Sequence, residues 1–411
     1  MRILLINHYA GSVRHGMEYR AFYLAREWVR LGHVVLVVAA SQSHVRTIQP
    51  AWPSALAVSA QERIDGVDYL WLRTPKYRGN GVGRVVNIAA FCLQLAWNAA
   101  RLARQFRPDA VVASSTYPMD IWPAARIARR AGAKLVHEVH VLWPLSPVEL
   151  GGMSAQHPFI RLCQAAEDFA CRHGDVVVSM LPKVQEHLRA RGLDLRKLHI
   201  VPNGVLADEW DAPGDPLTGA LAEHLRQVRL RGVLVVVYAG AHGLANALDS
   251  LLDAAALLKH EAFEFVLVGD GAERERLVRR VALEGLANVR WFAPIPKCQI
   301  PALLAQADIA YIGLQRVPIF RFGIAPNKLM DYMMAGCTVL SAIEAGNDPV
   351  GESGCGATVA AESPQAIAQG LRHLAAVPAD ARRAMGQRGR DFVRRHHTWP
   401  VLAQRFVAAM S

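Results

Sequence analysis

Short runs of β-branched and other apolar residues alternate along this chain with longer segments of helical periodicity, and the pattern occurs twice. The runs of the first half lie at residues 2–6, 34–38, 69–72, 110–113, 135–139 and 176–179. Those of the second half lie at residues 233–238, 265–268, 289–292, 309–312 and 339–341. Apolar strands separated by helices are typical of parallel sheets covered on both faces. The sequence therefore predicts the α/β fold class, with two doubly wound parallel-sheet domains.

A segment rich in proline and glycine separates the two halves. Val201-Pro202-Asn203-Gly204-Val205 precedes residues 208–216, which combine acidic residues with two prolines and a glycine. This composition is typical of a linker. We expect a hinge near residues 203–216, a first domain at 1–205, a second at 206–385 and a closing helical segment at 386–411.

The composition favours a folded protein with anionic partners. Of the 411 residues 52% are apolar, and 46 Lys and Arg outnumber 35 Asp and Glu, which gives a net charge of +11. This excess favours phosphate-bearing small molecules, anionic lipid or nucleic acid. The arginines are spread over both halves without a recognition module, which argues against nucleic acid as a partner.

We expect a cytoplasmic protein without a signal peptide or a transmembrane helix. The apolar run at residues 3–6 is too short for a signal core. The longest apolar stretch, residues 85–100, is interrupted by Asn87, Gln94 and Asn98 and falls short of the ~20 residues that cross a bilayer. Six cysteines without a C-x-x-C pair indicate reduced thiols, not a zinc site or a disulfide framework.

The first candidate site is the glycine-bearing turn after the first strand. It contains Arg14, His15, Gly16 and Glu18 and leads into a helix expected at residues 17–31. Backbone N–H groups and the helix dipole at such a turn favour an anion. Because any α/β domain needs glycines here and the pattern is not G-x-G-x-x-G, phosphate contact and plain turn chemistry stay open as equal alternatives.

The second candidate is the carboxyl end of the strand at residues 135–139, which runs out into polar residues. In open α/β sheets this end faces the ligand crevice. Strand alternation puts Glu138 and His140 on one face, apart from His137, so these two are best placed to act together. A functional and a structural role for this pair are about equally supported.

The third candidate is a loop and helix start within residues 321–336. Asn327 follows a proline at the expected helix start, and Lys328 and Asp331 share one face of the first turn. A cation beside free helix N–H groups suits a phosphate, and a carboxylate suits a ribose diol. The alternative is an exposed i,i+3 ion pair, which leaves Arg321 and Gly323 in the preceding loop unexplained. A fourth candidate, Gly269-Asp270-Gly271, either holds a nucleotide base or only turns the chain.

Together these segments resemble the family-4 retaining glycosyltransferases, which have two Rossmann-like domains of the GT-B type. The resemblance covers nearly the whole chain in five short motifs in the expected order. They are Arg30-Leu31-Gly32-His33-Val34, the V-H-x-x-W-P strand end at residues 139–144, Val201-Pro202-Asn203-Gly204-Val205, Val268-Gly269-Asp270-Gly271 and residues 328–336. The resemblance implies an acceptor-binding first domain, a donor-binding second domain and a C-terminal helix that packs back on the first.

By this resemblance the second domain binds a nucleotide-sugar donor, and UDP is the expected nucleotide. Asp331 stands where the family has a ribose-binding glutamate and His140 where it has a histidine near the donor sugar; with His140 we expect Glu138 and Lys328 to be catalytic. Arg14, His15, Glu18 and Trp143 are expected on the acceptor side. The expected donor-binding residues are Gly16, Gly240, His242, Gly243, Gly269, Asp270, Gly271, Arg321, Gly323, Asn327, Lys328, Leu329 and Asp331.

The sequence departs from the family at two places. Gly323 stands where the family has the first of two glutamates, and Glu138 and Glu344 are the candidates to replace it. The Arg and Lys that clamp the diphosphate are missing from the turn at residues 238–246, so Lys328, Arg321 or the backbone at Gly240 and Gly243 must meet that charge. This turn, with residues 149–153 and 344–349, resembles the branch that transfers N-acetyl-L-fucosamine or a similar amino sugar in bacterial surface-polysaccharide assembly.

Retaining transfer needs the leaving diphosphate stabilised as the sugar becomes oxocarbenium-like. Helix N-termini at Gly16 and Asn327, with Lys328 and Arg321, can do this, and the sequence has no D-x-D pair for a metal. We expect no metal and no cofactor besides the nucleotide sugar. The resemblance implies front-face attack, with the diphosphate accepting the proton of a lipid-linked saccharide acceptor.

An anionic membrane surface is the last expected partner. Residues 84–107 predict an apolar helix with Arg101, Arg104 and Arg107 at one end. Such a helix either lies on the inner face of the plasma membrane or packs in the core with a solvated basic end, and its periodicity does not choose between them. A rival activity on the same scaffold is a UDP-sugar 2-epimerase or hydrolase, which consumes the donor without an acceptor.

Overall fold

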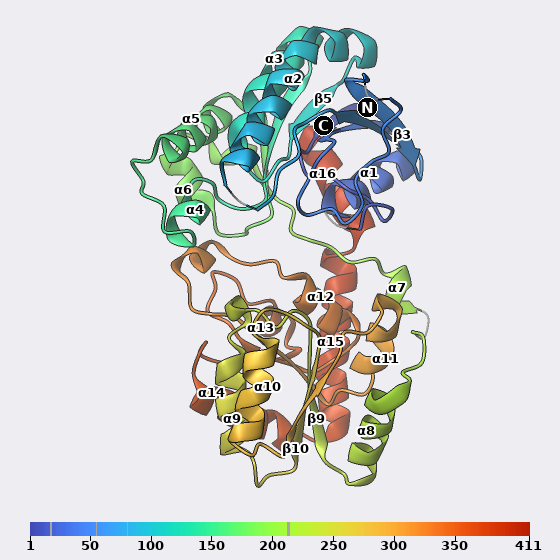
Figure 1. Ribbon diagram of the computed structural model, residues 1–411, viewed down its shortest axis with the longest axis vertical. Coiled ribbons are helices and arrows are strands. Elements are labelled where there is room, and N and C mark those ends of the chain that lie inside the picture. Colours follow the sequence, from blue (N-terminus) through green and yellow to red (C-terminus); the bar gives the residue numbers. More distant parts are fainter. Residues whose placement is uncertain (17–18, 55, 80, 212–213) are drawn as a thin grey trace. The chain divides into compact units, whose positions relative to one another are not determined.

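The computed structural model describes the whole chain except residues 17–18, 55, 80 and 212–213. It consists of two compact units: unit 1 comprises Met1–Asn203 and Trp399–Ser411, and unit 2 comprises Gly204–Thr398. Each unit has a mostly parallel sheet with helices packed on it (Figure 1). The predicted fold class, two Rossmann-like domains of the GT-B type, is confirmed.

The sheet of unit 1 has its described strands in the order β3-β4-β2-β1-β5-β6-β7-β8. They are β1 (Arg2–Ile6), β2 (Val34–Ala40), β3 (Ser59–Ile64), β4 (Val67–Leu72), β5 (Ala110–Ala113), β6 (Lys134–Val139), β7 (Val176–Ser179) and β8 (Leu198–Ile200). The helices are α1 (Tyr19–Arg30), α2 (Val82–Phe106), α3 (Ile121–Ala131), α4 (Leu145–Glu149), α5 (Pro158–His173), α6 (Gln185–Ala190) and α16 (Trp399–Met410). All neighbouring strands are parallel except β3 and β4, an antiparallel edge hairpin that the sequence did not predict.

The sheet of unit 2 has its described strands in the order β11-β10-β9-β12-β13-β14, all parallel. They are β9 (Leu234–Ala239), β10 (Phe263–Val268), β11 (Val289–Phe292), β12 (Ile309–Gly313), β13 (Val339–Ala342) and β14 (Gly356–Thr358). The helices are α7 (Asp208–Asp211), α8 (Gly219–Leu230), α9 (Leu248–Leu257), α10 (Arg274–Leu283), α11 (Ile300–Leu304), α12 (Asn327–Met334), α13 (Pro349–Ser353), α14 (Pro364–Ala376) and α15 (Ala379–His396). The predicted strands of both halves lie within two residues of these bounds.

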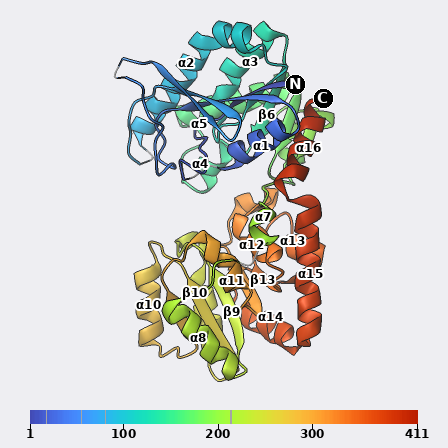
Figure 2. The same ribbon diagram turned by 90° about the vertical axis from the view of Figure 1, so that its right-hand side faces the viewer.

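The chain passes between the units twice, and the second passage corrects the predicted division. Residues 386–398 belong to unit 2, since α15 packs on α12, and only α16 joins unit 1. There α16 lies beside α1 (Figure 2), and Trp28 contacts the Phe406 ring at 5.1 Å and donates a hydrogen bond to the Ala403 carbonyl. The expected return of a C-terminal helix to the first domain therefore holds for residues 399–411.

Helix α2 is longer than the apolar stretch that the sequence marked. Its 25 residues form, within the described chain, one helix that is long and apolar enough by length and composition to cross a membrane. The expectation that this stretch is too short to span is therefore wrong on length. One side of the helix, including Ile88, Phe91 and Leu95, is nevertheless buried in the core of unit 1.

Candidate active site

The carboxyl end of β6 brings together the pair that strand alternation predicts. The Nε2 of His140 lies 3.2 Å from Oε2 of Glu138 and 3.1 Å from Oγ of Ser114, the residue that directly follows β5. Ser114 also donates a 2.5 Å hydrogen bond to Oε2 of Glu138. Glu138 is buried and His140 is partly exposed, so the imidazole is the part of this pair that a ligand can reach.

Arg20 completes this cluster, and sequence reasoning did not find it. From α1 it donates through Nε to Glu138 at 2.9 Å, and through its two terminal nitrogens to the carbonyls of Val201 and Pro202. Burial alone raises the pKa of Glu138, but Arg20 and His140 outweigh it and hold that pKa far below its ordinary value. We call Arg20, Ser114, Glu138 and His140 the strand-end cluster; its carboxylate is ionised and fixed in place.

The glycine-bearing turn before α1 is built around Gly16. This residue has a φ of 86°, and a Cβ on it would lie 1.9 Å from Oγ1 of Thr47, so only glycine fits. His15 is buried, with Nδ1 2.8 Å from Oγ of Ser12, and burial lowers its pKa. Arg14 extends into solvent near Glu62, and Glu18 lies outside the described residues. Within unit 1 the His15 side chain is therefore buried in the turn.

Trp143 lies beside the strand-end cluster, at the wall of a small pocket that also includes His137, Glu138, His140 and Tyr117. Its ring contacts Phe159 edge to face at 5.9 Å. Asp120, a residue the sequence did not single out, is buried nearby and accepts a hydrogen bond from the Ser115 N–H. Burial raises the pKa of Asp120 to about 7.

In unit 2 the two predicted glycine turns lie against each other. The His242 N–H donates to the Asp270 carbonyl at 2.8 Å. A Cβ on Gly269 would lie 1.9 Å from the Gly240 carbonyl oxygen, and one on Gly271 would lie 2.5 Å from the His242 carbonyl oxygen. Bulkier residues would separate the turns, so these glycines allow the close approach.

His242 packs between these turns with no exposed surface. Neither ring nitrogen has a hydrogen-bond partner in the described part of the chain. The ring meets Trp291 edge to face at 5.0 Å, and burial, with Arg274 nearby, lowers its pKa to about 4. His242 is therefore neutral at physiological pH.

Lys328 reaches from α12 to the first of these turns. Its Nζ donates to the Tyr238 hydroxyl at 2.6 Å and to Oδ1 of Asn246 at 3.0 Å, and its stem covers Gly240. Within the described residues it forms no ion pair, and burial lowers its pKa to about 8. The alternative of an exposed pair with Asp331 is therefore excluded.

Asp331 points instead into a separate pocket of about 430 Å³, lined among others by Trp210, Lys297 and Cys298. No hydrogen bond or ion pair joins its carboxylate to another residue that the structure describes. Burial raises the pKa of Asp331 to about 7. We call Lys328, Asp331, Tyr238 and Asn246 the α12 site. It presents a partly buried cation at the Gly240 turn and a partly buried carboxylate in the separate pocket, and neither has an ion-pair partner among the described residues.

The loop before α12 explains the glycine at the family's glutamate position. Gly323 has a φ of 98°, a conformation that glutamate would adopt only with strain. Asn347 fixes the next peptide, since its side chain bonds both the N–H and the carbonyl of Ile324. Arg321 lies exposed over the Phe322 ring, and Glu344 pairs with Arg316.

The other predicted donor-binding residues of unit 2 differ in their exposure and in their hydrogen bonds. Asn327 begins α12, as predicted, and is exposed, while Asp270 bonds its neighbour Gly271. Gly243 precedes a short 3-10 turn. The side chain of Leu329 is 1% exposed and packs in the hydrophobic core, so at this position only the backbone of the first turn of α12 is open to a ligand. Within the described residues, no group of three or more His, Cys, Asp or Glu could hold a metal ion.

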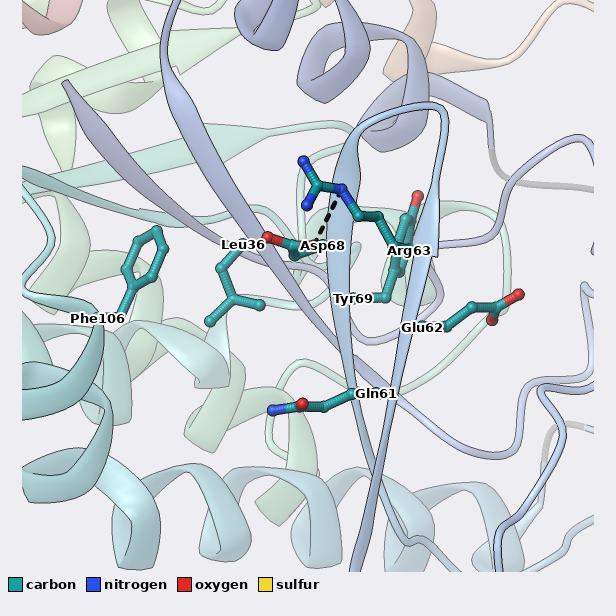
Figure 3. A pocket seen from close by; sticks show the side chains of 7 residues that line it. All are labelled: Leu36, Gln61, Glu62, Arg63, Asp68, Tyr69 and Phe106. Atoms are coloured by element: carbon teal, nitrogen blue, oxygen red, sulfur yellow. Dashed lines mark ion pairs between the residues drawn. The ribbon is translucent and has the colours of Figure 1, made fainter.

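A second hollow of unit 1, of about 400 Å³, lies at the sheet edge around the β3 and β4 hairpin (Figure 3). Leu36 and Phe106 form its apolar side, and an exposed ion pair between Arg63 and Asp68 crosses it at 3.6 Å. None of the candidate site residues lines it.

Comparison with known proteins agrees with the two-unit architecture. The family model of the glycosyl transferase 4-like domain matches residues 15–204, and that of glycosyl transferases group 1 matches residues 233–376. The chain is 24% identical to the probable glycosyltransferase WbjE of Pseudomonas aeruginosa over 66% of this chain and 67% of that protein. It is 23% identical to the putative colanic acid biosynthesis glycosyl transferase WcaI of Escherichia coli K12 over 86% and 87% of the two chains.

Among solved structures, Anabaena Alr3699/HepE in complex with UDP and glucose has the same fold, with a TM-score of 0.65, 15% identity and coverage of 99% and 98% of the two chains. The first model lies within unit 1 apart from its last residue, and the second lies within unit 2. Each half of the chain therefore matches a glycosyltransferase domain model, a glycosyl transferase 4-like domain followed by a group 1 domain, on two α/β units of the GT-B fold.

Proposed function

We propose that the protein is a retaining glycosyltransferase that moves a sugar from a UDP-linked donor to a lipid-linked saccharide in surface-polysaccharide synthesis. The observation that carries the donor assignment is Lys328, a partly buried cation that has only neutral oxygen partners among the described residues. A buried charge without a counter-ion is costly, so an anionic ligand beside it gains binding energy. The UDP and glucose bound by the structural neighbour HepE support a UDP sugar as that ligand.

The turns around Gly240 and Gly269 offer the backbone approach that a diphosphate and a base need. Lys328 lies at the Gly240 turn, where its charge balances that of the diphosphate in place of the Arg and Lys that the family has and this chain lacks. The Asp331 carboxylate faces a pocket of about 430 Å³ and has no partner among the described residues, which suits the two hydroxyls of a ribose. Gly271, Asp270 and His242 then lie on the base side.

In unit 1 the strand-end cluster supports a catalytic role for His140. The ionised Glu138 accepts a hydrogen bond from Nε2–H of His140, and Arg20 fixes that carboxylate. A histidine held in this way can form a hydrogen bond through its other ring nitrogen with a hydroxyl of the donor sugar or of the acceptor. Lys328 stabilises the leaving diphosphate as charge develops on it, so the transfer needs no metal and no further cofactor.

The transferred sugar is an N-acetylated amino sugar in this proposal, and the acceptor is lipid-linked. An N-acetylated amino sugar is supported by the resemblance of the turn at residues 238–246 and of residues 344–349. A role in polysaccharide synthesis is supported by the similarity to WcaI, a putative colanic acid biosynthesis glycosyl transferase. The lipid-linked acceptor is supported by the resemblance to the amino-sugar branch alone. An enzyme with such an acceptor works at the inner face of the plasma membrane.

A thermal-shift panel with UDP, GDP, ADP and dTDP tests the donor site, because a ligand that binds only the folded state raises its apparent stability. We expect UDP to raise Tm in the wild type and not in Asp331→Ala. Asp380→Ala, which removes an exposed carboxylate of α15 in the same unit, is the matched control and should keep the shift. The proposal fails if no nucleotide shifts the wild type. Consumption of a UDP sugar at the same rate with and without acceptor would instead indicate the epimerase or hydrolase.

A further inference from the structure

Helix α2 is apolar on two sides, and only one of them is used within unit 1. Ile88, Phe91 and Leu95 are at most 4% exposed and pack in the core. On the outer side Val82, Val86, Leu93 and Trp97 are 80%, 50%, 70% and 88% exposed. An exposed tryptophan and leucine one turn apart are unusual on a surface that contacts only water.

These four residues form one continuous line, which we call the α2 stripe. Their spacings of four, seven and four residues place them on a single helix face about 22 Å long. Arg101 and Arg104, four and seven residues after Trp97, extend the same line and are exposed. The helix lies on the outside of unit 1, with α3 packed beside it (Figures 1 and 2).

The chain around the stripe has charge of one sign only. Residues 69–108 contain seven Lys and Arg and no Asp or Glu. Lys76 and Arg78 lie exposed before the helix, and Arg107 lies exposed at its end. An apolar line with basic residues at both ends is the pattern of a helix that lies in the interface of an anionic bilayer.

The same charges argue against a second copy of this chain as the occupant. In a two-fold contact through the middle of the stripe, the basic end of one α2 would face the basic segment before the other α2. No carboxylate in residues 69–108 could compensate this repulsion. A lipid surface carrying phosphates fits both the apolar line and its basic ends.

We propose that the α2 stripe docks unit 1 onto an anionic bilayer, with α2 parallel to the membrane plane. Leu93 and Trp97 enter the boundary between headgroups and acyl chains, and Arg101 and Arg104 contact lipid phosphates. The helix does not span the membrane, because its opposite side holds the core of unit 1 together. That docking serves transfer to a lipid-linked acceptor rests on the proposed function, but docking itself requires neither donor nor acceptor.

Co-sedimentation with phosphatidylcholine vesicles, with and without about one-third phosphatidylglycerol, tests the proposal. The wild type should sediment with the anionic vesicles only. The double substitution Leu93→Asp and Trp97→Asp should lower the binding constant at least about tenfold, since it removes the buried apolar area. Arg101→Gln with Arg104→Gln should lower it about 30-fold at low salt, with the difference lost in high salt.

The matched control is Leu230→Asp with Leu283→Asp, two leucines of unit 2 that are 76% and 87% exposed. This control should bind like the wild type, and all variants should keep the wild-type Tm and the UDP shift, which separates failed docking from a failed donor site. An equal loss of vesicle binding in the stripe and control variants would overturn the proposal. So would a wild-type protein that does not sediment with anionic vesicles. A dimer in sedimentation equilibrium that Trp97→Asp dissociates would assign the stripe to self-association instead.

Discussion

The strand-end cluster of unit 1 and the α12 site of unit 2 both bury ionisable groups, but they balance charge differently. In the strand-end cluster, Arg20 lies 2.8 Å from Glu138 and the carboxylate is also hydrogen-bonded to Ser114 and His140. In the α12 site, Lys328 has neutral partners and Asp331 has none in the described chain. The pKa of Glu138 is lowered as a result, whereas burial brings the pKa of Asp331 to about 7 and of Lys328 to about 8.

In the strand-end cluster the charges balance within the protein, whereas in the α12 site we propose that a bound ligand balances them. Each member of a buried ion pair is stabilised by the opposite charge of the other. Removing one member therefore leaves an unbalanced buried charge and lowers the stability of the fold. A buried ion without a partner lowers stability until a ligand compensates it. Removing a charge should therefore lower the stability of unit 1 when the charge belongs to the strand-end cluster and raise the stability of unit 2 when it belongs to the α12 site, and both kinds of substitution should impair transfer.

The largest effect is expected for Glu138→Ala. Loss of this carboxylate leaves Arg20 buried beside the carbonyls of Val201 and Pro202, which should lower the free energy of unfolding by about 3–5 kcal/mol. Because the folded pKa of Glu138 is depressed, its contribution is present above the unfolded pKa and is lost only as the pH falls through the folded value. Urea denaturation at neutral pH measures the difference.

Asp68→Asn is the matched control for that experiment. It breaks the exposed pair with Arg63 in the same unit and should cost less than about 1 kcal/mol. Equal losses in the two variants would contradict the view that Glu138 balances a buried charge.

Asp331→Asn should act in the opposite direction on stability. The folded pKa of about 7 lies above the unfolded value, so the ionised carboxylate reduces stability as the pH rises from about 4 to 7. The asparagine variant lacks this loss and should be about 2 kcal/mol more stable than the wild type at pH 8, a value reduced for solvent at the pocket wall. Unfolding measured at pH 4, 6 and 8 tests it. Parallel pH curves for the two proteins would show that Asp331 is not desolvated.

Lys328→Met should separate stability from binding. The folded pKa of about 8 lies below the ordinary lysine value, so the charge reduces stability below pH 8 and the penalty disappears as the pH rises towards 10.5. Methionine keeps the stem over Gly240 and removes the charge, so we expect a gain of about 1 kcal/mol. The affinity for UDP should fall at least about tenfold, measured by calorimetry. Undiminished UDP affinity would remove Lys328 from the donor site.

How far the sequence predicted these sites depends on the range of the contacts. Strand alternation placed Glu138 beside His140, and the proline before Asn327 indicated that α12 begins there. Arg20 went unnoticed because its partner Glu138 lies 118 residues away and the carbonyls that it binds lie about 180 residues away. The β3 strand was missed because its exposed edge carries Gln61, Glu62 and Arg63 where a buried strand would be apolar.

Lys328 and Asp331 show the same limit within one helix turn. Their spacing correctly placed both residues in the first half of α12. It did not show that the two side chains extend to different parts of unit 2. The long stem of Lys328 reaches Tyr238 and Asn246 at the turn after β9, whereas the short side chain of Asp331 stays in the pocket beside Lys297. The length of each side chain and the position of the neighbouring strand determine which residues it contacts. The spacing of residues along the helix indicates neither.

The smallest and most specific effect is expected for Asn246→Asp, which gives the α12 site an internal counter-ion. The new carboxylate would stand where Oδ1 of Asn246 lies 3.0 Å from the Lys328 ammonium. It should raise the pKa of Lys328 and increase stability by less than about 1 kcal/mol, because solvent reaches the Asn246 side chain. It also repels an anion, so UDP affinity should fall about tenfold while Tm rises. Asn347→Asp, which alters a loop-fixing amide of the same unit, is the control and should not show this opposed pair of changes. If Asn246→Asp instead left UDP affinity intact, the diphosphate would have to bind away from Lys328, and the unbalanced lysine would be a structural feature of the β9 turn.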